Sequence, residues 1–187
     1  MKDYNLITIL GTTATGKTTL ACALANEIDS EIISADSRQV YRGMTIGTGK
    51  DLDDYLINGK QIPYHLIDIV DAGYKYNVFE FQRDFLSAFQ TISQKNKIPI
   101  LCGGTGLYIE AVLKGYKMIE VPTNQSLREH LESKTLEELT QILSTYKTLH
   151  NRTDVDTIKR AIRAIEIADY YSNHTEENTY YPPINSL

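Results

Sequence analysis

The chain is poor in cysteine and has no long apolar run. Its 187 residues include only two cysteines, Cys22 and Cys102. Two cysteines at these positions do not suggest a disulfide framework or a zinc site, so a reducing compartment fits best. The N-terminal residues lack the apolar segment of a signal peptide, and no segment reaches the length that spans a membrane. We therefore expect a cytoplasmic protein with no membrane partner.

An excess of positive charge is also missing. The formal net charge is -5, so the chain has no global basic field to attract a nucleic acid, and any such contact must be local. A hydrophobic content of 42% and a charged content of 23% are typical of a globular protein. The length allows one domain, or one domain with a small appendage.

The most informative segment is residues 11–18, here called the glycine loop. It matches the pattern G-x-x-x-x-G-K-[ST] at every fixed position, between an apolar β-branched run (residues 6–10) and a helical segment (residues 19–25). Such a loop turns backbone N–H groups toward a phosphate, which Lys17 also reaches, and Thr18 would bind Mg²⁺. The predicted diphosphate- or nucleotide-binding residues are Gly11, Thr12, Thr13, Ala14, Thr15, Gly16, Lys17 and Thr18.

A carboxylate follows the next predicted strand. Residues 31–35 form an apolar run that ends at Asp36. In a parallel α/β sheet, ligands gather outside the carboxyl ends of the strands, so Asp36 should lie beside the glycine loop. It could be a metal ligand, a proton acceptor or a helix cap.

Later segments continue the α/β pattern. Residues 43–50 contain three glycines and predict a loop close to a ligand, and residues 77–94 predict an amphipathic helix. Residues 62–70 and 97–102 predict strands, and the second is followed by a glycine turn that carries Thr105. His65, in the first of these strands, is more typical of a structural hydrogen bond than of a site.

The C-terminal third is polar and helical. Residues 126–129 and 133–146 predict a helix pair, and a final helix from Asp154 carries Arg160 and Arg163. Basic residues outnumber acidic ones near this helix, either as a solvated face or as a nucleic-acid contact. The last residues begin an apolar run where a further strand is expected, so the chain resembles an incomplete piece.

We therefore predict a P-loop NTPase-like α/β fold, a parallel sheet flanked by helices with a small helical insertion. The predicted divisions are a core over residues 1–122, a small helical insertion over 123–153, and a segment over 154–187 in which the helix that carries Arg160 and Arg163 returns to the core.

Several motifs together resemble one family, the tRNA dimethylallyltransferases or tRNA isopentenyltransferases. After the glycine loop, residues 36–50 are similar to the family's second signature at almost every position. Later blocks match in the same order, at residues 65–68, 81–84, 103–108 and 160–166. Thr12 stands where the family usually has proline, the helical insertion is short, and the family's C-terminal strand and helices are missing after Leu187.

The resemblance implies transfer of a dimethylallyl group from dimethylallyl diphosphate to the exocyclic amine of the adenine 3′ of a tRNA anticodon. The implied partners are therefore tRNA and dimethylallyl diphosphate, the implied cofactor is Mg²⁺, and the protein is expected to act as a monomer. The catalytic residues would be Asp36 as proton acceptor, Thr13 on the bridging oxygen, and Lys17 and Arg163 on the departing diphosphate. The implied tRNA contacts are Asp36, Ser37, Arg38, Gln39, Thr105, Arg128 and Arg160.

Three alternatives remain open. A small-molecule kinase could use ATP on the same loop. An adenylate isopentenyltransferase would keep the reaction and take free AMP or ADP as acceptor. A nucleotide-binding module without catalysis would use the loop alone.

Overall fold

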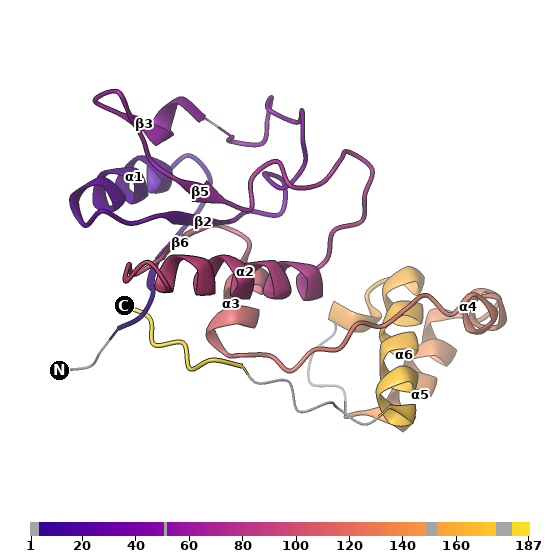
Figure 1. Cartoon of the computed structure of the whole chain (residues 1–187). Helices are drawn as coiled ribbons and strands as arrows, with labels where there is room; N and C mark the ends of the chain where they lie inside the picture. The colour runs from indigo at the N-terminus through magenta and orange to yellow at the C-terminus, as the bar shows by residue number, and fades with distance from the viewer. Residues whose placement is uncertain (1–3, 51, 149–152, 175–180) are drawn as a thin grey trace. The chain divides into compact units, whose positions relative to one another are not determined.

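The computed structural model describes residues 4–50, 52–148, 153–174 and 181–187. They form two compact units, an α/β unit over residues 1–117 and 181–187 and a helical unit over residues 118–180 (Figure 1). No helix in the described part of the chain is both long enough and apolar enough to cross a membrane.

The α/β unit is built on one parallel sheet. Its strands lie in the order β1 (Ile7–Leu10), β6 (Ile100–Gly103), β2 (Ile32–Ala35) and β5 (Tyr64–His65). The register pairs Gly103 with Leu10 on one side and with Ala35 on the other. The three strands therefore end level, and the residues that follow them leave the sheet at the same edge. This arrangement confirms the predicted α/β fold.

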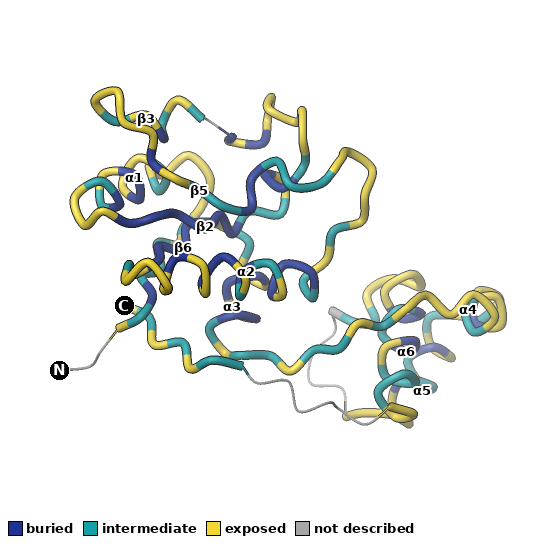
Figure 2. Tube along the Cα trace, in the orientation of Figure 1, coloured by how far each residue is buried: buried dark blue, intermediate teal, exposed yellow. Residues whose placement is uncertain are grey.

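Helices cover both faces of this sheet (Figure 2). One face packs against α1 (Lys17–Glu27), η1 (Leu52–Tyr55) and the hairpin of β3 (Leu56–Ile57) and β4 (Lys60–Gln61). The other packs against α2 (Val78–Ser93) and α3 (Gly106–Leu113). The aromatic stripe of α2 is core as predicted, since Phe81, Phe85 and Phe89 are all buried.

The strand predicted over residues 62–70 is shorter than expected. Pairing with β2 covers only Tyr64 and His65, because Leu66 and Asp68 have positive φ angles of 63° and 55° that leave the extended region. Asp68 is held there by Lys50, whose buried amino group lies 2.5 Å from a carboxylate oxygen of Asp68. The strand therefore ends at the first of two left-handed residues, inside an apolar pattern that is typical of a strand.

The end of the chain lies beside β1. Leu187 donates its N–H to the carbonyl of Leu6 and accepts from the N–H of Thr8, at 3.0 Å each. Leu6 and Ser186 form a parallel bridge. The further strand expected from the apolar C-terminal residues therefore begins to pair at the free edge of β1.

The helical unit contains α4 (Gln125–Glu132), α5 (Leu136–Tyr146), η2 (Thr153–Val155) and α6 (Ile158–Asn173). Its core joins all three α-helices through Leu131, Leu143 and Ile165. The last helix begins at Ile158 and not near Asp154, because the Thr157 side chain accepts the N–H of Arg160 and caps it there. The arginine helix thus packs with α4 and α5, and the divisions at residues 122 and 153 stay a prediction.

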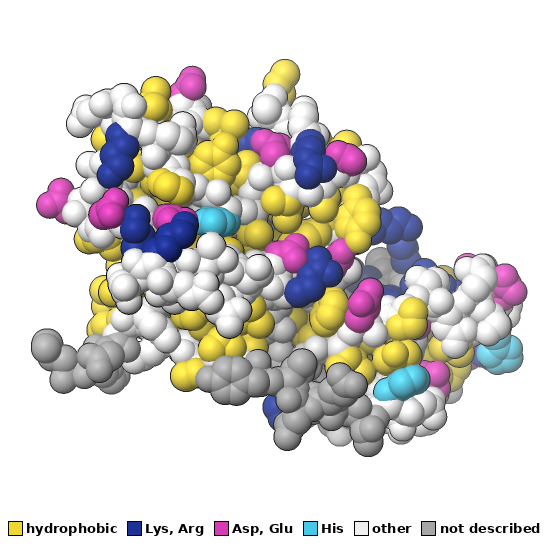
Figure 3. Space-filling model, in the orientation of Figure 1, with side chains coloured by type: hydrophobic (Ala, Val, Ile, Leu, Met, Phe, Trp, Pro, Cys, Tyr) yellow, Lys and Arg dark blue, Asp and Glu magenta, His cyan; other side chains and the backbone are white. Residues whose placement is uncertain are grey.

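Surface charges of both signs are interspersed. On the face in view, Lys and Arg side chains lie among Asp and Glu side chains over the α/β unit (Figure 3). This mixing agrees with the net charge of -5, which predicts no broad basic surface.

Candidate functional site

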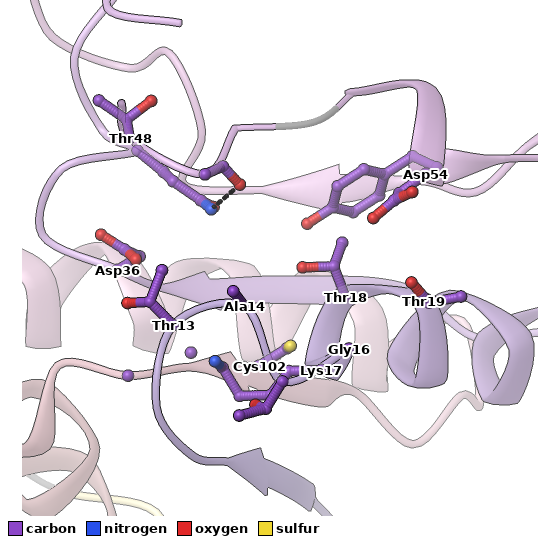
Figure 4. Close-up of a pocket in the computed structure, with 16 residues that line it drawn as sticks. Thr13, Ala14, Gly16, Lys17, Thr18, Thr19, Asp36, Thr48, Asp54 and Cys102 are labelled. Atoms are coloured by element: carbon purple, nitrogen blue, oxygen red, sulfur yellow. Dashed lines mark hydrogen bonds between the residues drawn. The ribbon is translucent and has the colours of Figure 1, made fainter. Parts of the chain in front are cut away.

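A cavity of about 210 Å³ opens at the carboxyl edge of the sheet (Figure 4). Residues from five parts of the chain line it: the glycine loop with the start of α1, the end of β2, the loop before η1, η1 itself, and the end of β6. They are Thr13, Ala14, Thr15, Gly16, Lys17, Thr18, Thr19, Asp36, Gln39, Thr48, Gly49, Asp54, Tyr55, Cys102, Gly103 and Gly104. The level strand ends explain why residues so far apart in sequence meet here.

The glycine loop has a backbone suited to an anion. Ala14 and Gly16 have positive φ angles of 62° and 80°, which fold the loop tightly ahead of α1. Gly16 is the N-cap residue of α1 and has no side chain, so no side-chain cap covers the first N–H groups of the helix. The Lys17 ammonium donates to the Thr12 carbonyl, and the Thr15 hydroxyl donates to the same oxygen at 2.8 Å. Free helix amides beside a lysine can bind a phosphate.

Asp36 lies in this cavity directly after β2. Its Oδ1 accepts the N–H of Arg38 at 2.9 Å, which stabilises a turn over residues 36–39. No helix begins after Asp36, so the interpretation of Asp36 as a helix cap is wrong. Its side chain caps a turn instead. Among the described residues no donor is bonded to Oδ2, so that oxygen can accept a proton or bind a ligand.

A second cavity, of about 290 Å³, is also lined by Asp36. It is lined by Gly11, Thr12, Thr13, Asp36, Ser37, Arg38, Gly104 and Thr105. Thr105 supports its wall, because its hydroxyl oxygen accepts the N–H of Ser37 at 2.9 Å. Thr13, Asp36 and Gly104 line both cavities. The structure therefore brings the predicted loop residues together with Asp36, Ser37, Arg38 and Thr105.

Gln39 has a structural role that the sequence did not indicate. Its buried side chain accepts from the Ser34 hydroxyl at 2.8 Å and donates to the Gly49 carbonyl at 3.0 Å. The loop expected near a ligand, residues 43–50, is fixed by this bond and by Lys50, which also donates to the Tyr41 carbonyl at 2.6 Å. Both contacts hold Gly49 and Thr48 against the cavity.

Four residues of the cavity wall were missed by the sequence analysis. Thr19 follows the glycine loop, and Cys102 lies beneath it with burial raising its pKa to about 11, an effect that nearby Lys17 opposes. Asp54 and Tyr55 come from η1, and burial also raises the pKa of Tyr55. The Asn58-Gly59 pair between β3 and β4 is a strong hairpin signal, and it could have located the hairpin that directly follows η1.

His65 lies away from this edge. Its Nε2 is 2.9 Å from Glu31, which precedes β2, and Lys95 lies 2.7 Å from the same carboxylate. These contacts hold the amino end of the sheet together, as the structural interpretation of His65 predicts.

The three arginines singled out from the sequence all belong to the helical unit. Arg160 pairs with Asp156, one turn earlier on the chain. Arg128 and Arg163 instead meet at one buried carboxylate, that of Glu166. The structure therefore groups Arg128 with Arg163, and it does not group Arg160 with either.

A parallel sheet with a glycine loop between β1 and α1 defines an α/β protein of the P-loop NTPase-like fold. The sequence model of the IPP transferase family matches residues 39–184, and that of the isopentenyl transferases matches residues 4–71. The chain belongs to the IPP transferase family. This finding confirms the resemblance found in its motifs.

Individual relatives agree with this assignment. The chain is 69% identical to a tRNA dimethylallyltransferase 2 of Bacteroides fragilis over 100% of its own length and 61% of the relative's, and 66% identical, with the same coverage, to one of Phocaeicola vulgatus. A solved tRNA isopentenylpyrophosphate transferase of Bacillus halodurans is 32% identical with a TM-score of 0.61, covering 99% of this chain and 59% of that one.

A eukaryotic dimethylallyltransferase acting on tRNA shares the fold, with a TM-score of 0.73 at 24% identity over 99% of this chain and 47% of that one. The chain thus spans about three fifths of the length of the first two relatives.

Proposed function

We propose that the protein transfers a dimethylallyl group from dimethylallyl diphosphate to the exocyclic amine of the adenine 3′ of a tRNA anticodon, releasing diphosphate. The observation that carries this proposal is that Asp36 and Thr13 line both cavities. A transferase that joins two substrates needs a donor site and an acceptor site that share the reacting groups.

The cavity between the glycine loop and η1 would hold the diphosphate. In the reaction, the bond between the allylic carbon and a diphosphate oxygen breaks, and negative charge develops on the leaving group. The amides of residues 14–18 and the Lys17 ammonium would stabilise that charge. Lys17 would exchange its bond to the Thr12 carbonyl for a phosphate oxygen, and Thr13 would donate to the bridging oxygen.

The second cavity would hold the adenine. The amine nitrogen attacks the allylic carbon as the diphosphate leaves, and it then carries a surplus proton. Asp36 lines both cavities, and among the described residues no donor is bonded to its Oδ2, so Asp36 would accept that proton. Ser37, Arg38 and Thr105 would contact the flipped-out nucleotide from the wall of the second cavity.

The residues at the first cavity fit a bound Mg²⁺ ion. The Thr18 hydroxyl and the Asp54 carboxylate both line the cavity, and oxygen ligands of these kinds suit this ion (Figure 4). Within the described part of the chain no group of three or more His, Cys, Asp or Glu side chains could hold a metal ion, so the diphosphate and water would supply its other ligands. When bound, Mg²⁺ would neutralise charge on the diphosphate.

One incubation tests the proposal against its alternatives. The chain is mixed with radiolabelled dimethylallyl diphosphate, Mg²⁺ and either an unmodified anticodon stem-loop or AMP, and a parallel reaction contains labelled ATP. Label in the stem-loop supports the proposal. Label in AMP alone indicates an adenylate isopentenyltransferase, and phosphoryl transfer from ATP without prenyl transfer indicates a kinase. Binding of the diphosphate with no product in any reaction indicates a module without catalysis.

A further inference from the structure

Glu166 is a buried carboxylate at the centre of the helical unit. Its side chain is 1% exposed, and each of its two carboxylate oxygens accepts two hydrogen bonds. Oε1 accepts from the Asn124 N–H at 2.7 Å and from Nε of Arg128 at 2.8 Å, and Oε2 accepts from Arg128 at 2.6 Å and from Arg163 at 2.5 Å. Burial alone would raise the pKa of Glu166, but these hydrogen bonds outweigh it and lower the pKa to about 2. The carboxylate is therefore charged at neutral pH.

Two guanidinium groups share this single negative charge. Arg128 comes from α4 and Arg163 from α6, and their side chains are 31% and 39% exposed. These three side chains together carry a formal charge of +1, and the Glu132 carboxylate also acts on Arg128 by charge. Each guanidinium has five N–H donors, and the bonds to Glu166 and to the Val121 carbonyl leave several on each unused.

We propose that Glu166 is a positioning residue that holds Arg128 and Arg163 as one paired cation, and that this pair binds a phosphate group. A guanidinium fork matches the geometry of phosphate oxygens, and anchoring each fork on its inner side reduces the conformational entropy lost on binding. The inference rests on the proposed function, which supplies two sources of phosphate: the RNA backbone and the diphosphate of the prenyl donor. It also joins Arg128 and Arg163 in one role.

The same helix offers a matched control. Arg160 pairs with Asp156, but both side chains are well exposed, at 59% and 42%, and one charge balances the other. Glu166→Gln and Asp156→Asn each remove one negative charge next to an arginine on α6. Net charge alone predicts that both variants bind a polyanion more tightly. If Glu166 positions the two arginines, Glu166→Gln should weaken binding, whereas Asp156→Asn should not.

The experiment measures binding of an anticodon stem-loop RNA and, separately, of inorganic diphosphate to the chain and its two variants over a range of salt concentrations. We expect Glu166→Gln to weaken binding of one of the two probes about tenfold, because the forks lose their anchor. The slope of log affinity against log salt for RNA should also fall by about 0.7 to 0.9 if one phosphate contact is lost. Asp156→Asn should leave affinity unchanged or increase it up to about threefold, because it frees Arg160.

The affected probe identifies the source of the phosphate. A loss confined to RNA assigns the pair to the tRNA backbone, and a loss confined to diphosphate assigns it to the prenyl donor. The inference is overturned if Glu166→Gln binds both probes as tightly as the unsubstituted chain or more tightly, if Asp156→Asn weakens binding equally, or if the unsubstituted chain binds neither probe.

Loss of folding must be separated from loss of positioning. Far-UV circular dichroism and thermal melting establish a temperature at which each variant is folded. Arg128→Lys keeps the charge and removes the fork, so it should reproduce the loss of affinity in a chain whose Glu166 is intact. Prenyl transfer is scored separately: a chain that makes product but shows no Glu166 effect refutes this inference alone, and a chain with the effect but no product refutes the proposed function alone.

Discussion

The carboxylate at the glycine-loop cavity of the α/β unit and the carboxylate of the Glu166 cluster in the helical unit differ in how many hydrogen bonds they accept. Asp36 is half-buried, its side chain accepts one backbone hydrogen bond among the described residues, and the residue lines two cavities. Glu166 is buried and accepts four hydrogen bonds. An unsatisfied polar group at a cavity is available for chemistry, whereas a saturated one stabilises and orients its neighbours. The comparison assigns a reaction to Asp36 and a positioning role to Glu166.

The largest effect should come from removing the open carboxylate. Asp36→Ala should lower the rate of prenyl transfer about 1000-fold while leaving diphosphate binding within about tenfold, because a proton acceptor acts mainly in the transition state. Single-turnover transfer and equilibrium binding measure the two quantities. The control is Asp71→Asn, since Asp71 is exposed and pairs with exposed Arg42 at 3.1 Å. A collapse of diphosphate affinity in Asp36→Ala would instead make Asp36 a metal or structural residue.

Removing the saturated carboxylate should affect folding more than Asp36→Ala does. Glu166→Ala leaves Arg128 and Arg163 without their shared anion and leaves the Asn124 N–H without its acceptor. We expect a loss of about 3 kcal/mol in the free energy of unfolding, at the low end for a broken buried ion pair because both arginines are partly exposed. Hydrogen exchange should show the loss in α4 and α6 while protection of β1, β2 and β6 is unchanged. Equal destabilisation by Asp36→Ala would remove the contrast between the two sites.

Acid should remove the stabilisation that the Glu166 carboxylate gives the helical unit. The pKa of Glu166 is about 2 in the folded unit, below the value of about 4.3 expected for an unfolded chain. A lowered folded pKa favours the ionised form, so this stabilisation is complete above about pH 5 and is lost as the pH falls toward 2. The helical unit of the unsubstituted chain should therefore lose up to about 3 kcal/mol across this range. In Glu166→Gln that part of the pH dependence should disappear, as followed by urea unfolding at several pH values.

Local signals explain which parts of the structure could be predicted. The glycine loop, the carboxylate after β2 and the amphipathic α2 follow from residues that are close in sequence and from the rule that ligands gather at the carboxyl ends of parallel strands. The early end of β5 could not be predicted, because the left-handed backbone of Leu66 and Asp68 has no signal in the apolar pattern of residues 62–70.

The same limit applies to Glu166. Its i,i+3 spacing to Arg163 is visible in the sequence, but Arg128 lies 38 residues away, and only the packing of α4 on α6 brings it in. Long-range polar contacts such as this one have no periodic signature, so the sequence analysis described Arg128 and Arg163 as separate site residues.

The smallest expected effect tests whether the close approach of β2 and β6 positions the residues that line the cavity. A Cβ at Gly103 would lie 2.3 Å from the Ala35 carbonyl oxygen, whereas a Cβ at Gly106, three residues later, would meet nothing within 4 Å. Gly103→Ala must therefore separate β6 from β2, and we expect a cost of about 2 kcal/mol together with weaker diphosphate binding. Gly106→Ala should change stability by less than about 0.5 kcal/mol. Thermal melting and diphosphate titration measure both. If Gly103→Ala were as stable and bound diphosphate as well as Gly106→Ala, the close approach of β2 and β6 would not be what places Asp36 beside the glycine loop.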